Sequence, residues 1–229
     1  MDRYSNYEAL GVETLPARLG ELDLLTDRLG DPYGWQVEEV GDGNLNLVFI
    51  VTGAKETVIV KQALPYVRLV GDSWPLPLYR AFYEYHALIR QEAFDPGSVP
   101  EIFYFDDAQA LIVMEYLSPH VILRRKLILG EKVEGLGTRL GLFCARTAFR
   151  GSELCLQSEK KKSDVALFAG NIEIPAITEA LVFRDPYFDA EMNHHTEGLD
   201  PIVAILRNDV AMKSEVQALF RAFSAKSET

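Results

Sequence analysis

A glycine turn, a lysine and a glutamate carry the chemistry that is readable in this sequence. Gly41 and Gly43 lie between two β-rich runs, where the absence of a side chain lets backbone N–H groups approach phosphate oxygens. Lys61 closes a third β-rich run, VIVK, and would set a cation against the same phosphates. Glu84 lies in the helical stretch that follows and would hold that lysine in position. This order of residue types predicts a site for a nucleoside triphosphate.

Each of these residues also has an ordinary structural explanation. A Gly-x-Gly turn between strands is usually a hairpin or a bulge, and a lysine at a strand end is usually a solvated charge. Glu84 follows Arg80 by four residues, so a salt bridge along one helix would account for both. Glu92 is the other candidate partner for Lys61, but it lies close to the predicted end of the helix. The ordered combination is more specific than any one member.

A short linker follows the apolar run LIVM further along the chain. The backbone of Glu115, Tyr116 and Leu117 would be available there to hydrogen-bond an adenine ring, with Met114 directly before them. The alternative is an exposed strand end that binds nothing. After this linker the sequence changes from strand-like to helical patterns.

A sheet is needed to position these residues, and the hydrophobic periodicity predicts one. Alternating apolar residues predict strands over 35–40, 45–52, 57–61, 101–105 and 108–114, with a helix over 79–92. The proline-rich stretch LPYVRLVGDSWPLPL between the third strand and that helix is expected as a loop. Helical periodicity predicts the other elements, which lie before residue 30 and over 136–149, 163–168, 174–183 and 199–223.

This element order favours an α+β fold of the protein-kinase-like type. A β-rich N-terminal lobe would be followed by the beginning of a helical C-terminal lobe. The expected domains are an N-terminal helical extension over 1–30, a nucleotide-binding lobe over 31–117 and a partial helical lobe over 118–229.

Composition and charge exclude several classes of protein. The chain has 229 residues with 23 basic and 34 acidic side chains, so its net charge is -11, which disfavours general binding to nucleic acid or anionic membranes. No run of about 18 apolar residues predicts a membrane span, and the N-terminus lacks the apolar core of an export signal. Cys144 and Cys155 are expected as reduced, partly buried core residues. We expect a cytoplasmic protein.

Five segments, taken together, resemble one known family. They are GDGNLNLVF (41–49), VIVKQALPYVR (58–68), GDSWPL (71–76), VPEIFYFD (99–106) and LIVMEYLSPHVILR (111–124). The chain resembles the S-methyl-5-thioribose kinases, which are related to aminoglycoside and choline kinases. KQALPYVR and GDSWPL are the most specific to this family. The resemblance covers nearly all of the chain and continues weakly through 140–149 and 177–187.

The resemblance implies a reaction and a set of contacts. The family transfers the γ-phosphate of ATP to the anomeric hydroxyl of 5-methylthioribose, using Mg²⁺, in methionine salvage, and it suggests a homodimer. Asn44 looks like an ATP contact, Met114 would line the back of the adenine pocket, and Trp74 would lie in a loop beside the nucleotide cleft. The full set of expected ATP-binding residues is Gly41, Gly43, Asn44, Lys61, Glu84, Met114, Glu115, Tyr116 and Leu117.

The family's catalytic residues are expected outside this sequence. The family carries an HGDLH-type loop and a later D-x-E metal motif, and no histidine here has an aspartate two positions on. A D-x-E occurs at 189–191, but no such loop precedes it, so a polar loop between helices is favoured over a metal site. We therefore expect the catalytic aspartate beyond Thr229, no magnesium ligand in the chain and no turnover by the chain alone.

Two further functions remain as alternatives. The first is a non-catalytic module that binds nucleotide or a partner. The second is another small-molecule kinase related to the aminoglycoside and choline kinases, although KQALPYVR and GDSWPL favour the methylthioribose enzymes.

Overall fold

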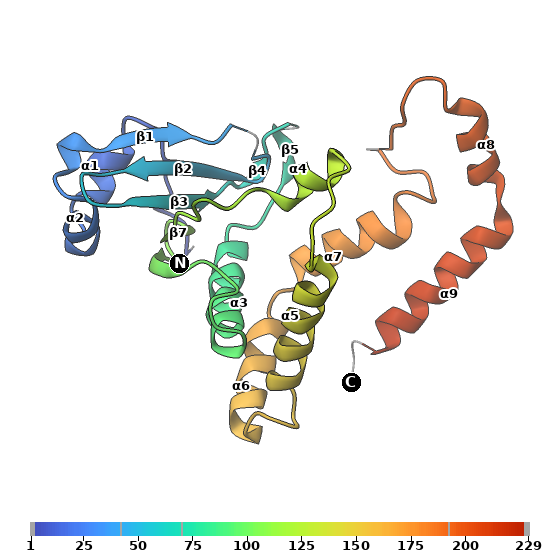
Figure 1. The fold of residues 1–229 in the computed structure, drawn as a ribbon. Coiled ribbons are helices and arrows are strands. Elements are labelled where there is room, and N and C mark those ends of the chain that lie inside the picture. Colours follow the sequence, from blue (N-terminus) through green and yellow to red (C-terminus); the bar gives the residue numbers. More distant parts are fainter. Residues whose placement is uncertain (1–2, 42, 70, 192, 227–229) are drawn as a thin grey trace. The chain divides into compact units, whose positions relative to one another are not determined.

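The computed structural model describes residues 3–41, 43–69, 71–191 and 193–226 (Figure 1). The chain divides into two compact units, Met1–Gly170 and Asn171–Thr229. In the described residues the first unit holds the strands and helices α1 to α6, and the second holds helices α7 to α9. The lobe boundaries expected near residues 30 and 117 stay predictions.

An antiparallel sheet of five strands forms the centre of the first unit. Its order is β1-β2-β3-β7-β6, so the chain leaves β3, forms helix α3, and returns through the edge strand β6 to pair β7 with β3. The sheet with its helices confirms the α+β class. The strands are β1 (Gln36–Glu39), β2 (Asn46–Thr52), β3 (Thr57–Ala63), β6 (Ile102–Asp106) and β7 (Leu111–Glu115).

Two short helices near the N-terminus, α1 (Leu15–Leu19) and α2 (Asp23–Leu29), cover one face of the sheet. A 3-10 turn, Pro32–Gly34, then leads into β1. Their leucines and alternate residues of the central strands share one buried cluster, and removing this apolar surface from water stabilises the unit. The cluster includes Leu15, Leu19, Leu25, Leu29, Phe49, Val51, Val58 and Val60.

The hairpin turn between β2 and β3 lies tightly against the end of α2. The amide of Ala54 donates to the carbonyl of Leu29 at 2.8 Å. A Cβ atom on Gly53 would lie 2.2 Å from that same carbonyl oxygen. Only glycine allows the two backbones to approach so closely, and the helix is thereby fixed to the sheet.

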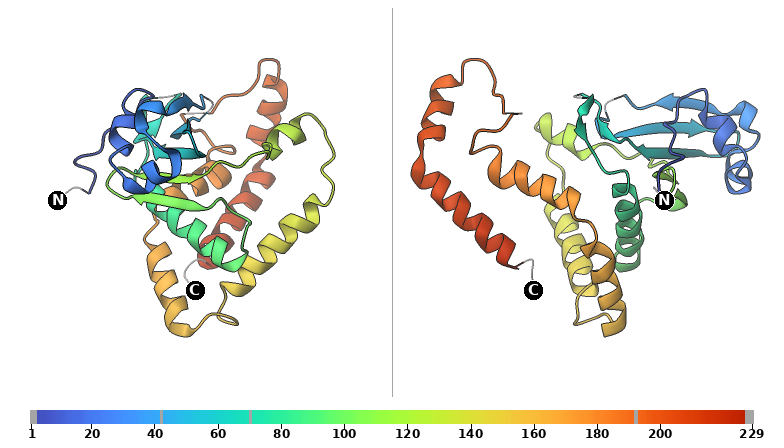
Figure 2. Two further views of the ribbon diagram at one scale, coloured as in Figure 1. Left: turned by 60° about the vertical axis from the view of Figure 1, so that its left-hand side comes forward. Right: turned by 180° about the vertical axis from the view of Figure 1, so that it is seen from behind.

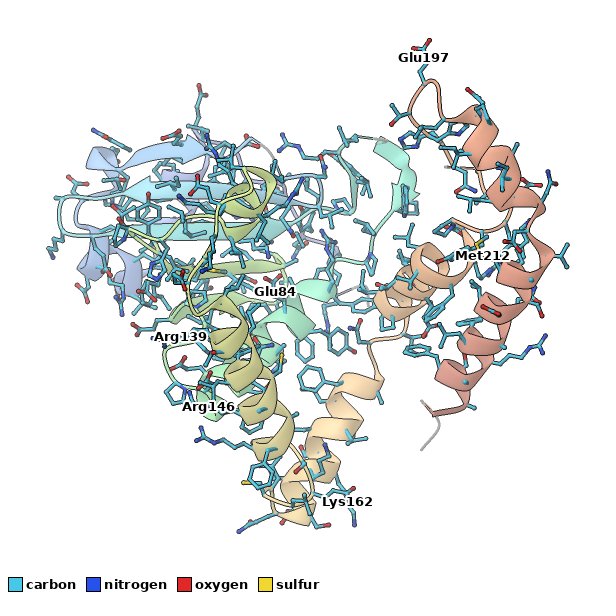
Figure 3. All side chains as sticks on the ribbon, turned by 45° about the vertical axis from the view of Figure 1, so that its right-hand side comes forward. Glu84, Arg139, Arg146, Lys162, Glu197 and Met212 are labelled. Carbon is cyan, nitrogen blue, oxygen red and sulfur yellow. The ribbon has the colours of Figure 1, made fainter. Side chains whose placement is uncertain are left out.

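Helix α3 (Arg80–Phe94) contacts strands β3, β6 and β7. At its C-terminal end it meets α5 (Leu136–Arg150) and α6 (Ser158–Ala169), and Figure 2 shows these three helices next to one another. Arg90 donates to the Asp164 carboxylate at 2.9 Å. Arg146, labelled on α5 in Figure 3, donates to Asp95 at 2.6 Å. Helix α4 (Leu123–Ile128) precedes α5.

A two-stranded sheet stands where the sequence predicted a loop. Strand β4 (Tyr66–Val67) pairs antiparallel with β5 (Gly71–Pro75). A strand of two residues has no alternation to detect, and prolines at a strand end disguise it further.

The second unit consists of helices and a polar loop. Helix α7 (Glu173–Glu179) continues as a π-helical turn (Ala180–Arg184), and α8 (Asp200–Asn208) is separated from α9 (Val210–Lys226) at Asp209. The ring of Phe183 lies 5.2 Å from the rings of Phe220 and Phe223. The Asn193 side chain donates to two carbonyls at 2.7 Å and closes the loop that contains residues 189–191.

The prediction that the two cysteines are core residues is wrong, because Cys144 and Cys155 are both free and exposed. Helix α5 contacts α3 and buries none of its residues. Helical periodicity identifies an apolar face, but it does not show whether another element covers that face.

No single helix in the described part of the chain is long and apolar enough to cross a membrane. The segments Ser158–Ala169 and Glu173–Arg184 satisfy length and composition only when they are counted together as a bent pair.

Candidate nucleotide site

Strand β3 places Lys61 on the face of the sheet opposite to the N-terminal helices. Val60 and Gln62 are buried toward those helices, so the alternation of the strand turns Lys61 to the other side. Val48 of β2 and Ile112 of β7 are its direct neighbours in the two adjoining strands. The lysine therefore stands in the middle of the sheet among apolar side chains.

Glu84 of α3 holds this lysine. The Nζ atom of Lys61 lies 2.5 Å from Oε1 of Glu84, and Figure 3 shows Glu84 on α3 close to the sheet. The two side chains keep 24% and 35% of their surface exposed, so solvent reaches the pair. Pairing orients the ammonium group and leaves further N–H donors for an anion. The structure thus brings together the two residues that the sequence analysis paired.

Neither of the alternative arrangements is formed. In the described residues Arg80 makes no ion pair with Glu84; its guanidinium donates instead to backbone carbonyl groups. The carboxylate of Glu92 accepts the N–H of Gly97 at 3.1 and 3.0 Å and so closes the turn after α3. Glu84 is therefore the helix carboxylate that reaches Lys61.

The glycine turn connects β1 to β2. A Cβ atom on Gly43 would lie 2.8 Å from the carbonyl oxygen three residues further on, whereas Gly41 faces open space. The carbonyl of Asn44 accepts the N–H of Arg68 at 2.8 Å, which ties the turn to the segment after β4. Asp42, the middle residue of the expected turn, lies outside the described residues.

The linker after β7 divides into a paired residue and two exposed ones. The N–H of Glu115 donates to the carbonyl of Glu101 at 2.8 Å, and its carboxylate accepts the N–H of Glu101 at 3.1 Å. Tyr116 and Leu117 are exposed, and no backbone hydrogen bond within the described residues involves either. Their backbone groups can therefore bond a ligand, while the amide of Glu115 is already bonded to Glu101, the residue before β6.

An apolar strip lies beside Lys61, and of its members only Met114 was expected from the sequence to line the adenine pocket. Val48, Ile50 and Ile59 are only partly buried, and Met114 is 9% exposed. Ile59 pairs directly with Ile50 on one side and with Met114 on the other, so these side chains form a continuous row across three strands. A flat apolar row beside a cation suits a base with its phosphates on the lysine. The alternation of residues in β2 and β3 indicated which side chains share a face. Identifying the row across three strands also required the register between the strands.

Trp74 lies in β5 and is partly buried, whereas a loop was expected for it. Among the described residues, no three His, Cys, Asp or Glu side chains come together to hold a metal ion. Kinases bind magnesium through acidic side chains near the phosphates. The described residues of this site do not supply such a set.

Curated methylthioribose kinases from bacteria and plants match the chain over nearly its whole length. The one from Escherichia coli O45:K1 (strain S88 / ExPEC) is 44% identical over 211 residues, covering 91% of this chain and 50% of the relative. Methylthioribose kinase 2 of Oryza sativa subsp. japonica is 41% identical over 217 residues, covering 93% and 48%. That of Geobacillus kaustophilus (strain HTA426) is 40% identical over 226 residues, covering 98% and 56%.

The chain spans about half the length of these curated relatives. Over that span its sequence is similar to the methylthioribose kinases of bacteria and plants. No family model matches the chain.

Proposed function

We propose that residues 1–229 form the ATP-binding part of a methylthioribose kinase, with a protein-kinase-like N-terminal lobe. The observation that carries the proposal is the Lys61–Glu84 ion pair at 2.5 Å. It forms on the face of the antiparallel sheet opposite to the N-terminal helices, the open face, next to α3. Protein kinases need this lysine–glutamate pairing between the third strand and the following helix to hold the phosphates. The relatives named methylthioribose kinase support the same class of reaction.

The nucleotide would lie along the open face of the sheet. Its base would rest on the row formed by Ile50, Ile59 and Met114 and would bond the backbone of Tyr116 and Leu117. Its phosphates would extend toward Lys61. The glycine turn, with Gly41, Gly43 and Asn44, would cover them with backbone N–H groups, and Glu115 would anchor the linker to β6 through its bonds to Glu101.

The reaction proposed for the whole kinase is transfer of the γ-phosphate of ATP to the anomeric hydroxyl of 5-methylthioribose, which gives 5-methylthioribose 1-phosphate. A magnesium ion and a carboxylate that orients the hydroxyl are required. The sequence contains no His-x-Asp, and the described residues form no metal cluster. We therefore propose that residues 1–229 bind ATP without turning it over. A cytoplasmic homodimer acting in methionine salvage is proposed with the family.

Titration of the 1–229 protein with ATP, followed by fluorescence of an N-methylanthraniloyl analogue, tests this proposal. We expect saturable binding that K61M weakens by about tenfold or more. K55M is the matched control, because Lys55 lies in the hairpin turn and donates to the carbonyl of Asp27 at 3.0 Å. Equal binding by K61M and the unchanged protein would refute the site.

A non-catalytic nucleotide-binding module is the second candidate, and the missing His-x-Asp favours it for these residues alone. Incubation with ATP, magnesium and methylthioribose separates the candidates when the chain is compared with a variant extended by the C-terminal half of the Escherichia coli relative. Sugar phosphorylation only by the extended protein supports a kinase part. Binding without turnover by both proteins supports the module.

A further inference from the structure

Arg80, the first residue of α3, joins three backbone segments through one guanidinium group. Its Nη1 donates to the carbonyls of Leu64 and Pro77 at 2.8 and 2.9 Å. Its Nη2 donates to the carbonyl of Leu45. An arginine can satisfy several acceptors at once because its donors are held in a rigid plane.

The three carbonyls belong to the segments that frame the candidate site. Leu45 ends the glycine turn just before β2, Leu64 follows β3 three residues after Lys61, and Pro77 precedes α3. The amide of Leu64 also donates to the carbonyl of Leu45 at 3.1 Å, so Arg80 lies where the turn and the end of β3 already meet. Through Arg80 the start of α3 is bound to both.

Glu84 follows Arg80 by one helical turn on the same side of α3. The position of the Glu84 carboxylate against Lys61 therefore depends on the distance between the start of α3 and β3. Burial lowers the pKa of Arg80 below its usual value, an effect partly offset by Tyr7, Glu84 and Tyr4. This partial burial shields the two bonds made by Nη1 in part from water, which strengthens the hold on the helix.

We propose that Arg80 is a positioning residue that sets α3 at the distance where Glu84 pairs with Lys61, and that it couples this pair to the glycine turn. The role of Arg80 in ATP binding rests on the proposed function, whereas its effect on the Lys61–Glu84 distance rests on the contacts alone. In the described residues Arg80 donates to three backbone carbonyls and, at 3.5 Å, to the side-chain Oδ1 of Asn46. Most of the link between the start of α3 and the site therefore persists when neighbouring side chains are substituted.

A second arginine on the same helix provides a matched control. Arg90 lies ten positions further along α3 and donates to Asp164 of α6 at 2.9 Å. It also stabilises α3, but it binds the helix to α6 and not to the sheet. R80M and R90M each remove one guanidinium from α3. Only R80M should disturb the Lys61–Glu84 pair.

The first experiment measures the acetylation rate of Lys61 by mass spectrometry, with Lys55 as the internal reference. An ion pair slows acetylation because the amine must leave its carboxylate partner before it can attack the reagent. We expect E84Q to raise the Lys61 rate about threefold to fivefold, R80M to raise it about as much, and the double variant to add nothing further. R80K retains a cation and several donors and should give an intermediate rate. If R80M does not fold, the R80K variant is used in its place.

The second experiment measures ATP affinity for the same variants. R80M and E84Q should weaken binding by similar factors, and their combination should be no worse than either alone. An unchanged Lys61 rate in R80M, or an equal rise in R80M and R90M, would overturn the positioning role and leave Arg80 as a general stabiliser of the fold. If the unchanged protein does not bind ATP, the proposed function fails, while the acetylation rates still decide what Arg80 does.

Discussion

The side-chain amide of Gln62 fixes the N-terminal segment to the middle of the sheet through the backbone of Leu10. Its Oε1 accepts the N–H of Leu10 at 2.7 Å, and its Nε2 donates to the carbonyls of Glu8 and Gln109 at 3.0 and 3.1 Å. Gln62 is fully buried; its bond to Leu10 is made away from water, and the bonds to the two carbonyls are partly shielded. It directly follows Lys61, and the two side chains leave β3 on opposite faces.

Replacing Gln62 with leucine keeps the side-chain volume and removes all three bonds. A buried backbone N–H and two carbonyls would lose a partner, so we expect the free energy of unfolding to fall by about 2–4 kcal/mol. Urea denaturation measures the loss. Q109A is the control, because Gln109 bonds the same segment through Asn6 and Glu8 in an exposed position. Its expected loss is below about 1 kcal/mol. Equal losses would show that burial of the amide is unimportant.

Tyr7 makes the attachment of the N-terminal segment dependent on pH. Its hydroxyl donates to the carbonyl of Ala63 at 2.8 Å. Burial raises the pKa of Tyr7 from 10.0 to about 12, and nearby Arg80 opposes part of this rise. Because folding favours the protonated hydroxyl, its stabilising contribution is complete below about pH 10 and is lost as the pH rises toward about 12.

The variant Y7F should lower the free energy of unfolding by about 1 kcal/mol at neutral pH, since the hydrogen bond is lost. The difference between the two proteins should stay constant up to about pH 10 and shrink as the pH rises from about 10 to 12. Urea denaturation at several pH values tests this. Y33F serves as a control because Tyr33 is fully exposed, and its difference should stay flat. A constant difference for Y7F would contradict the pKa shift as the cause.

The sequence predicted the local parts of this fold and site better than the long-range connections. Alternation along β3 and the helical period around Glu84 are properties of neighbouring residues, so the strand, the helix and the Lys61–Glu84 pairing were predictable. From the sequence alone, Gln62 is only a polar residue at the end of a predicted strand. Its partner Leu10 lies 52 positions away, and no local pattern connects the two.

Arg80 and Cys144 show two other limits of sequence reasoning. Arg80 was paired with Glu84 by helical spacing, but it bonds backbone carbonyls, which have no residue-type signature. Cys144 lies in an apolar helical pattern and is exposed, because an apolar face does not reveal whether a neighbour covers it. The strip beside Lys61 needed the register of three strands, which the sequence does not fix.

The two glycines of the turn before β2 should respond differently to alanine. A Cβ atom on Gly43 would lie 2.8 Å from a backbone oxygen, so G43A must shift the backbone and should cost about 1–2 kcal/mol of unfolding free energy. Gly41 faces open space, and G41A should leave stability within about 0.5 kcal/mol. If the turn covers phosphates, G41A should still weaken ATP binding severalfold. Thermal denaturation measures the change in stability, and nucleotide titration measures the change in ATP affinity.

Ile59 and Val60 are neighbours in β3 that face opposite sides of the sheet, and this allows a direct test of which face binds the nucleotide. Val60 is 1% exposed and belongs to the core with the N-terminal helices, while Ile59 is partly buried between Ile50 and Met114. V60A should lower the free energy of unfolding by about 2 kcal/mol through the cavity it leaves, with ATP affinity of the folded protein unchanged.

The I59A variant should affect ATP affinity more than stability. Stability should fall by about 1 kcal/mol or less, while ATP affinity should drop by about threefold to tenfold because the base loses apolar contact. Both affinities are measured at a temperature where denaturation curves show each variant folded, so that unfolding does not imitate weak binding. Loss of affinity in V60A with none in I59A would place the nucleotide away from the open face. It would also separate the Lys61–Glu84 pair from any role in binding ATP.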